Sequence, residues 1–221
     1  MKRSQILIVL LVALSFAVSI YFYPMMPETI ASHWNAEGQV NGYMPKTIGV
    51  FLMPIISLAL ALLFMIIPMI DPLKANIEKF RKHYDRFIAL ILLFLLAVQM
   101  QVILWNTGTP ISPNMTFPVG LGILFFYTGV LCENAKRNWF IGIRTPWTLS
   151  NDLVWDKTHK IGAKLFKISG IIAIFGVFFQ SYAIYFSIIP AIFTGIFTVI
   201  YSYVEYRKVM KNSRNTDRQR K

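Results

Sequence analysis

The chain has 221 residues, of which 56% are hydrophobic, 15% aromatic and 14% charged. Soluble domains are usually about 45–50% apolar and about 25% charged, so this composition excludes an ordinary soluble domain as well as a disordered chain. Lys and Arg number 22 against 10 Asp and Glu, and a net charge of +12 fits either nucleic-acid binding or a membrane that sorts basic residues. A single cysteine, Cys132, excludes an internal disulfide framework and a multi-cysteine zinc site.

Transmembrane helices are predicted for five stretches that contain no Asp, Glu, Lys, Arg or His: residues 6–23, 48–70, 87–105, 116–132 and 168–204. The last stretch would form a helix of about 55 Å, whereas the hydrocarbon core is about 30 Å thick. It must therefore turn back, and we expect the turn near residues 185–187, because Pro190 suits the first turn of a new helix. The first stretch lacks a small-residue cleavage site and is interpreted as an uncleaved anchor.

The basic residues give an independent prediction of topology, since Lys and Arg concentrate in cytoplasmic loops. If the N-terminus is cytoplasmic, 21 of the 22 lie in cytoplasmic segments and only Lys46 lies outside. We therefore expect an all-α polytopic protein of the cell membrane with six transmembrane helices and both termini in the cytoplasm. The positive charge then reflects orientation in the bilayer, and direct nucleic-acid binding is not expected.

The first outer loop, residues 24–47, is rich in turn-forming residues. It is interpreted as a folded cap at the membrane surface or as a recognition surface. His33 and Glu37 have the spacing of two metal ligands on a helix, but Gly38 opposes a long helix and a third ligand is missing, so we expect no metal. The candidate recognition residues of this loop are Pro27, His33, Trp34, Asn35, Gly38, Gly42 and Lys46.

The third cytoplasmic segment, residues 134–167, has an unusual composition. Arg144 lies among Trp139, Phe140 and Trp147, where it could stack on an indole, hold a lipid phosphate or bind carbonyl groups. Two interpretations stay open, a structural collar and a binding surface for a protein partner. The candidate partner-binding residues are Asn138, Gly142, Arg144, Thr145, Pro146, Trp147, Thr148, Trp155 and His159.

The second half of this segment predicts an interfacial amphipathic helix before the fifth span. Ser150 and Asn151 are typical of a helix start. Apolar and small side chains then recur on one face, and lysines supply the other positions. The face consists of Val154, Thr158, Ile161 and Leu165.

These features divide the chain into four parts. Residues 1–70 form a two-span module with the outer loop, and residues 71–133 hold a cytoplasmic loop with spans three and four. Residues 134–204 combine the unusual segment with a helical hairpin of spans five and six. Residues 205–221 form a basic cytoplasmic tail.

Two motifs together resemble the SdpI family of bacterial and archaeal membrane proteins. One is the outer-loop pattern of Pro27, Glu28, His33, Trp34, Asn35, Gly38, Gly42 and Lys46, which is similar to the N-terminal module found in longer members. The other is the run NWFIGIRTPWTLS at residues 138–150, followed by Trp155, Lys157, Thr158 and His159. The best-known member of the family is an immunity protein, which protects a sporulating bacterium from its own secreted toxic peptide and holds a transcriptional repressor at the membrane.

The resemblance implies an immunity or receptor-like membrane protein, with the lipid bilayer, an extracellular toxic peptide and a cytoplasmic repressor as partners. The alternative is a transporter or channel for a neutral or lipid-like substrate, because the predicted spans contain no ionisable residue. An enzyme is not expected, since no nucleophile–base pair and no set of metal ligands can be assembled. No cofactor is expected either.

Overall fold

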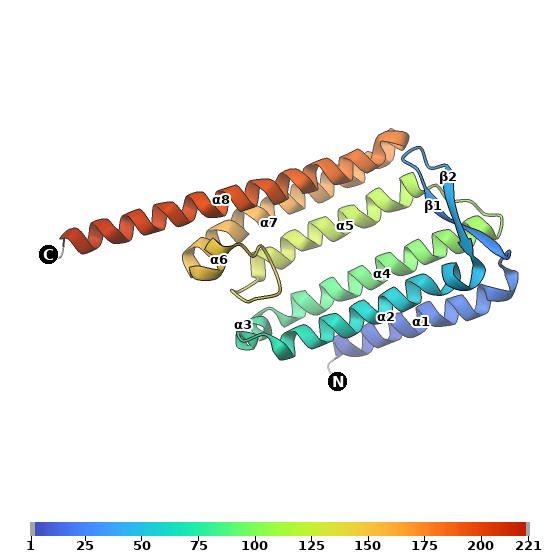
Figure 1. Cartoon of the computed structure of the whole chain (residues 1–221), viewed down its shortest axis with the longest axis horizontal. Coiled ribbons are helices and arrows are strands. Elements are labelled where there is room, and N and C mark those ends of the chain that lie inside the picture. Colours follow the sequence, from blue (N-terminus) through green and yellow to red (C-terminus); the bar gives the residue numbers. More distant parts are fainter. Residues whose placement is uncertain (1–2, 220–221) are drawn as a thin grey trace.

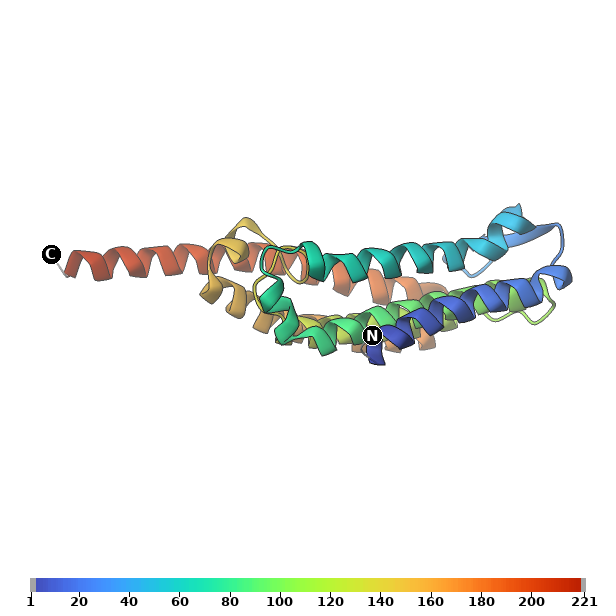
Figure 2. The ribbon, with the colours of Figure 1, turned by 90° about the horizontal axis from the view of Figure 1, so that it is seen from below.

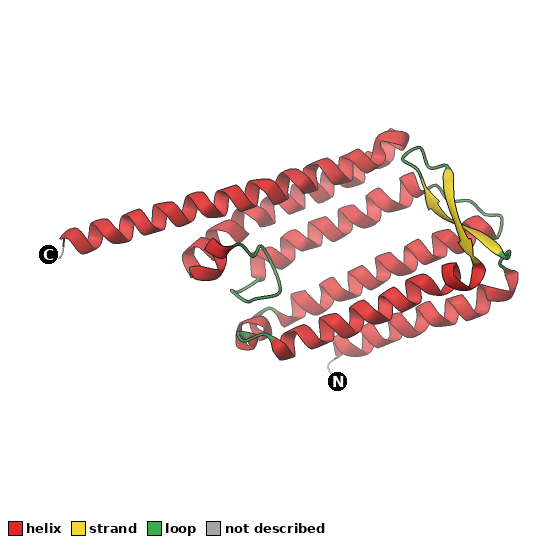
Figure 3. Ribbon diagram, viewed as in Figure 1, coloured by secondary structure: helices red, strands yellow, loops and turns green. Residues whose placement is uncertain are grey.

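A computed structural model describes residues 3–219 of the chain, and the side chains of residues 4–212 (Figures 1 and 3). The structure is mainly helical, as predicted. Its elements are α1 (Arg3–Phe22), η1 (Tyr23–Met25), β1 (Thr29–Trp34), β2 (Val40–Pro45), α2 (Lys46–Ile70), α3 (Lys74–Lys79), α4 (Arg81–Asn106), α5 (Pro113–Asn134), α6 (Pro146–Ser150), α7 (Asp152–Phe175), η2 (Gly176–Tyr182) and α8 (Ala183–Gln219).

The long helices have the length and composition of membrane spans. Five helical stretches in the described chain are long and apolar enough to cross a bilayer, and the fifth combines α7, η2 and α8 into 61 residues. Large hydrophobic side chains are exposed along α1, α2 and α8, including Leu10, Leu62 and Ile189. A protein in water rarely exposes so much apolar surface. The chain is therefore a multi-pass membrane protein whose outer surface contacts lipid, and a count of six crossings stays a prediction.

The long fifth stretch reverses direction, but not where the sequence predicted. The turn lies at η2, residues 176–182, and not at residues 185–187. Gly176 permits this turn, because a methyl group there would lie 2.8 Å from the carbonyl oxygen of Ala183. Within the turn, Gln180 has a positive φ of 40°. Pro190 is inside α8 and does not begin a helix. After the turn, α8 packs against α7 and continues past the other helices (Figure 2).

The helices form two groups, α1 with α2 and α4, and α5 with α7 and α8, which join where α4 packs against α5 (Figure 1). The tightest seam is between α5 and α7. A methyl group on Gly129 would lie 2.5 Å from the carbonyl oxygen of Ala163, and one on Gly170 would lie 2.5 Å from that of Gly122. Small residues let transmembrane helices approach in this way, since lipid supplies no hydrophobic drive for helix association. We call the two ends of the bundle the hairpin end, with β1 and β2, and the α6 end.

A β-hairpin, which the sequence did not predict, caps one end of this otherwise helical bundle. Strands β1 and β2 pair antiparallel, with bulges between Ala31 and Trp34. Asn106, at the end of α4, accepts a hydrogen bond from the Ala31 N–H at 2.8 Å and donates one to the Ala31 carbonyl at 3.0 Å. The Asn106 side chain therefore makes the two hydrogen bonds to Ala31 that a strand on the other side of β1 would make.

The predicted interfacial amphipathic helix is not a separate helix. Residues 152–175 form one continuous helix, α7, and Asn151 caps its start by accepting hydrogen bonds from the N–H groups of Leu153 and Val154. The predicted apolar face exists, but Val154 and Thr158 are fully buried. Because α7 packs against α5 and α8, this face is covered by protein and does not rest on the membrane surface.

Candidate functional site

The segment that connects α5 to α7, residues 135–151, is built around Asn138. This side chain is completely buried. Its amide nitrogen donates to the carbonyl oxygens of Lys136 and Ile141, and its oxygen accepts from the N–H groups of Phe140 and Ile141, at distances of 2.6 to 2.9 Å. The carboxamide has all its hydrogen bonds and no group left for a partner. Asn138, predicted as a partner-binding residue, therefore has a structural role.

A second buried group joins this segment to α7. Trp155 donates its indole N–H to the Ala135 carbonyl at 3.0 Å and stacks on His159, with ring centroids 3.9 Å apart. The Ile143 N–H donates to His159 Nε2 at 3.0 Å, so Nδ1 carries the proton and donates to the Trp155 carbonyl. The lysines nearby place His159 outside the uncharged part of α7. Burial lowers the pKa of His159 from 6.5 to about 4, so the imidazole is neutral.

Gly142 lets the connecting segment approach this histidine. Its φ of 110° is a conformation that residues with a side chain rarely adopt, and a methyl group on it would lie 2.4 Å from His159 Nε2. Pro146 then begins α6, and Thr145 and Thr148 form a capping box in which each hydroxyl accepts from the other residue's N–H. Thr145 also donates to Ser202 at 3.0 Å and so joins the segment to α8.

The exposed part of the segment is an aromatic and basic surface at the α6 end. Trp139 is 52% exposed, and Phe140 and Arg144 are also exposed. Of the three roles considered for Arg144, the structure shows hydrogen bonding to a carbonyl, since the guanidinium donates to the Trp139 oxygen at 3.2 Å. Trp147 is half-buried against Tyr203 of α8. We call Trp139, Phe140, Arg144 and Pro146 the α6-end surface.

The sequence analysis missed two residues that fasten this segment to the linker between α2 and α4. Asp71 is 2% exposed, and its carboxylate accepts from the N–H groups of Leu73 and Trp139. Asn76 donates to the Arg137 carbonyl at 2.8 Å. The position of Asp71 immediately after an uncharged span could have predicted its role. A carboxylate that is buried there needs hydrogen-bond donors from elsewhere in the fold.

The predicted outer-loop residues separate into two sets. Lys46 pairs with Glu28 at 3.0 Å, across the base of the hairpin, and Pro27 precedes β1. Gly42 faces His33 across the strands, where a methyl group would lie 2.8 Å from the His33 Cβ. Gly38 forms the turn with a φ of 79°. These four residues shape the hairpin, and the helical spacing considered for His33 and Glu37 is absent because His33 lies on a strand.

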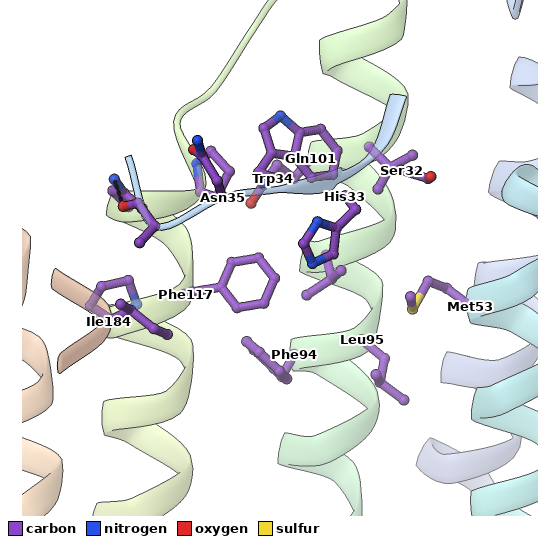
Figure 4. Close-up of a pocket in the computed structure, with 16 residues that line it drawn as sticks. Ser32, His33, Trp34, Asn35, Met53, Phe94, Leu95, Gln101, Phe117 and Ile184 are labelled. Atoms are coloured by element: carbon purple, nitrogen blue, oxygen red, sulfur yellow. Dashed lines mark hydrogen bonds between the residues drawn. The ribbon is translucent and has the colours of Figure 1, made fainter. Parts of the chain in front are cut away.

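The other set, His33, Trp34 and Asn35, lines a cavity of about 460 Å³ beneath the hairpin (Figure 4). The cavity lies between the two helix groups, and its walls come from α2, α4, α5 and the start of α8. Phe94 of α4 and Phe117 of α5 form much of its apolar surface. Asn114, at the start of α5, donates to the Ala36 carbonyl at 3.0 Å and holds the hairpin over the opening.

The polar groups of this cavity are few, and no Asp, Glu, Lys or Arg is among its lining residues. The Trp34 indole N–H is buried without a hydrogen-bond partner among the described side chains and backbone. Gln101 is 2% exposed, lines the cavity and accepts a hydrogen bond from Thr116. His33 Nδ1 bonds Asn41 on the neighbouring strand. Such a cavity can hold an apolar group. A glutamine within an uncharged span was the sequence indication for Gln101.

Comparisons with known proteins match both motifs found in the sequence. The SdpI/YfhL protein family matches residues 134–202, and a domain of unknown function (DUF1648) matches residues 10–58. The chain is 27% identical over 208 residues to "Immunity protein SdpI" of Bacillus subtilis (strain 168), which covers 94% of this chain and 98% of the relative. No solved structure matches. The predicted resemblance is thereby confirmed.

The contact between Gly142 and His159 gives a first prediction. Gly142→Ala should lower the free energy of unfolding by about 2 kcal/mol or more, because the methyl group adds a clash to an unfavourable φ. Gly108→Ala is the control, since Gly108 has a φ of 94° but no atom within 4 Å of the added methyl. Thermal unfolding of the purified proteins measures both. An equal loss of unfolding free energy in both variants would show that the close approach of Gly142 to His159 does not add to the cost of the substitution.

The neutral His159 gives a second prediction, for pH. Above about pH 6.5 the histidine is neutral in both the folded and the unfolded chain. As the pH falls from about 6.5 to 4, only the unfolded chain gains the proton, so the free energy of unfolding should fall by up to about 3 kcal/mol. His159→Gln cannot take up that proton. A melting temperature that falls equally steeply with acid in the wild type and in this variant would refute the prediction.

Proposed function

Since the SdpI/YfhL protein family matches residues 134–202 and the outer-loop motif lines a cavity, we propose that the chain is an immunity protein that protects its cell against a secreted toxic peptide. The observation that carries this proposal is the cavity beneath the hairpin. It has the size and apolar lining of a small-ligand site, and three of the residues singled out in the sequence contribute to it.

The cavity suits a segment of an apolar peptide. An apolar side chain of the peptide would pack against Phe94 and Phe117, whose rings contact each other edge to face with centroids 5.9 Å apart. No charged side chain lines the cavity in the described part of the chain, so the peptide segment that enters should be uncharged.

The proposed orientation places the hairpin end outside the cell membrane and the α6 end in the cytoplasm. It rests on the distribution of Lys and Arg, of which all but Lys46 then lie on the cytoplasmic side. The chain then crosses the membrane six times, with α7 and α8 as the last two spans and both termini inside. The four-part division proposed from the sequence follows these spans. The basic tail runs along the last part of α8 to Gln219, and residues 220–221 lie outside the described chain.

The α6-end surface is the proposed binding site for a cytoplasmic repressor. The buried residues of the motif, Asn138, Trp155 and His159, use their polar groups within the protein, so they would support this surface and not touch the partner. Trp139 and Arg144 remain exposed, and exposed aromatic and Arg side chains are the residue types that contribute most to protein interfaces.

A transporter or channel for a neutral or lipid-like substrate is the second candidate. It is favoured by the uncharged lining of the same cavity and by Pro118 inside α5, where a helix can be interrupted. Flux of a neutral substrate into liposomes that contain the protein would support it. Protection of cells without any such flux would favour the immunity function.

Protection should depend on the open cavity. Val98→Phe adds an aromatic ring to the lining of the cavity. For a peptide against which the wild type protects, this variant should reduce protection about tenfold or more, the equivalent of 1.4 kcal/mol of binding free energy. Leu93→Phe is the control, because Leu93 lies on the same helix and is 45% exposed on the lipid side. The measurement is killing of a sensitive strain by a panel of secreted peptides, at equal protein abundance. No protection by the wild type, or full protection by Val98→Phe, would contradict the proposal.

Recruitment of a repressor should depend on the α6-end surface. Arg144→Ala should reduce the amount of a cytoplasmic partner that sediments with membranes, without lowering the abundance of the protein itself, since Arg144 is exposed and makes one side-chain bond to a carbonyl. Lys136→Ala is the matched control, an exposed basic residue in the same segment. A loss of protein abundance in Arg144→Ala would instead support a purely structural collar.

A further inference from the structure

A second hollow lies at the α6 end, in a groove between α7 and α8. Its volume is about 230 Å³, several times the share of about 30 Å³ that one water molecule occupies in the liquid. Three lysines of α7 line one wall, and two residues of α8 line the other. The lining residues are Lys157, Lys160, Ile161, Lys164, Tyr201 and Glu205.

The groove carries an excess of positive charge. Glu205 is buried, and it binds Lys157 and Lys208 through its two carboxylate oxygens, each at 2.8 Å. These hydrogen bonds lower the pKa of Glu205, so the carboxylate is charged and is neutralised by its two lysines. Lys160 and Lys164 are exposed, and neither has an ion-pair partner among the side chains that the structure describes. They lie one helical turn apart on the same face of α7.

The groove lies at the depth of the lipid headgroups. The uncharged part of α7 begins after Lys167 and that of α8 ends before Glu205, so both helices leave the hydrocarbon at this level. From Lys157 to Lys164 the helix rises about 10 Å, comparable to the headgroup layer, which is about 5–7 Å thick on each side of the bilayer. Tyr201 borders the groove on the membrane side, a position that tyrosine favours in membrane proteins.

We propose that this groove binds the phosphate of an anionic phospholipid, held by Lys160 and Lys164. Lys157 fixes the groove by joining α7 to Glu205 on α8 and adds its charge to the rim. The acyl chains of the lipid would continue along the exposed apolar side chains of the two helices, including Ile168 and Ile200. A soluble phosphate would satisfy the lysines but would leave that apolar surface unused, so the structure favours the lipid.

The test uses the purified full chain in a neutral detergent, with binding measured by native mass spectrometry. Phosphatidylglycerol, phosphatidylcholine and glycerol 3-phosphate are added separately. The wild type should bind phosphatidylglycerol in preference to the other two. Lys160→Gln/Lys164→Gln should weaken that binding roughly 30-fold, on the basis of the usual contribution of each lysine near anionic lipid. Lys160→Arg/Lys164→Arg keeps both charges and should retain it.

The control variant is Lys74→Gln/Lys82→Gln, which removes two exposed lysines elsewhere at the α6 end and leaves the groove intact. It should bind phosphatidylglycerol like the wild type. An equal loss in this control would show that binding follows total charge, which overturns the proposal. Equal binding of phosphatidylcholine would also overturn it. Equal binding of glycerol 3-phosphate would assign the groove to a soluble anion. Unchanged melting temperatures without added lipid verify that the variants fold.

Discussion

Backbone-to-backbone contact between α5 and α7 is the constraint on which the rest of the structure depends. The glycines at this seam bring the two helices closer than any side chain would allow. Their ends at the α6 side are consequently close together, and the 17 residues between them, 135–151, must fold into a compact turn that pairs its buried backbone groups. Asn138, Trp155 and His159 supply the missing partners. Part of the unusual composition of the motif follows from this requirement, because these three buried residues each bond a carbonyl or N–H group of the turn.

The two sequence motifs have different roles in the fold. At the α6 end, the buried carboxamide of Asn138 and the imidazole of His159 have every hydrogen bond they can make. At the hairpin end, His33, Trp34 and Asn35 line an apolar cavity. The motif with more numerous buried polar residues therefore supports the turn, and the outer-loop motif lines the cavity.

Much of the membrane architecture could be predicted from the sequence, and most of the site could not. Uncharged runs identify the spans because a charge in lipid is costly. The reversal at Gly176 was missed because Pro190 was the stronger turn-forming residue by propensity, whereas the backbone approach at Gly176 is visible only once α7 and α8 are packed. The hairpin was missed because β2 contains Gly42 and Pro45, and because the outward-facing backbone groups of β1 bond the Asn106 side chain and not a further strand. The cavity combines residues from separate helices, so only its hairpin wall, His33 to Asn35, was foreseeable.

Asn138 makes all of its hydrogen bonds to backbone atoms, at residues 136, 140 and 141. These hydrogen bonds are therefore independent of the side chains that those residues carry. Lys136 and Phe140 point to the surface and can be exchanged during evolution without loss of the frame that presents them. The exposed positions can in this way change while Asn138, together with Trp155 and His159, keeps the backbone of the turn in one shape.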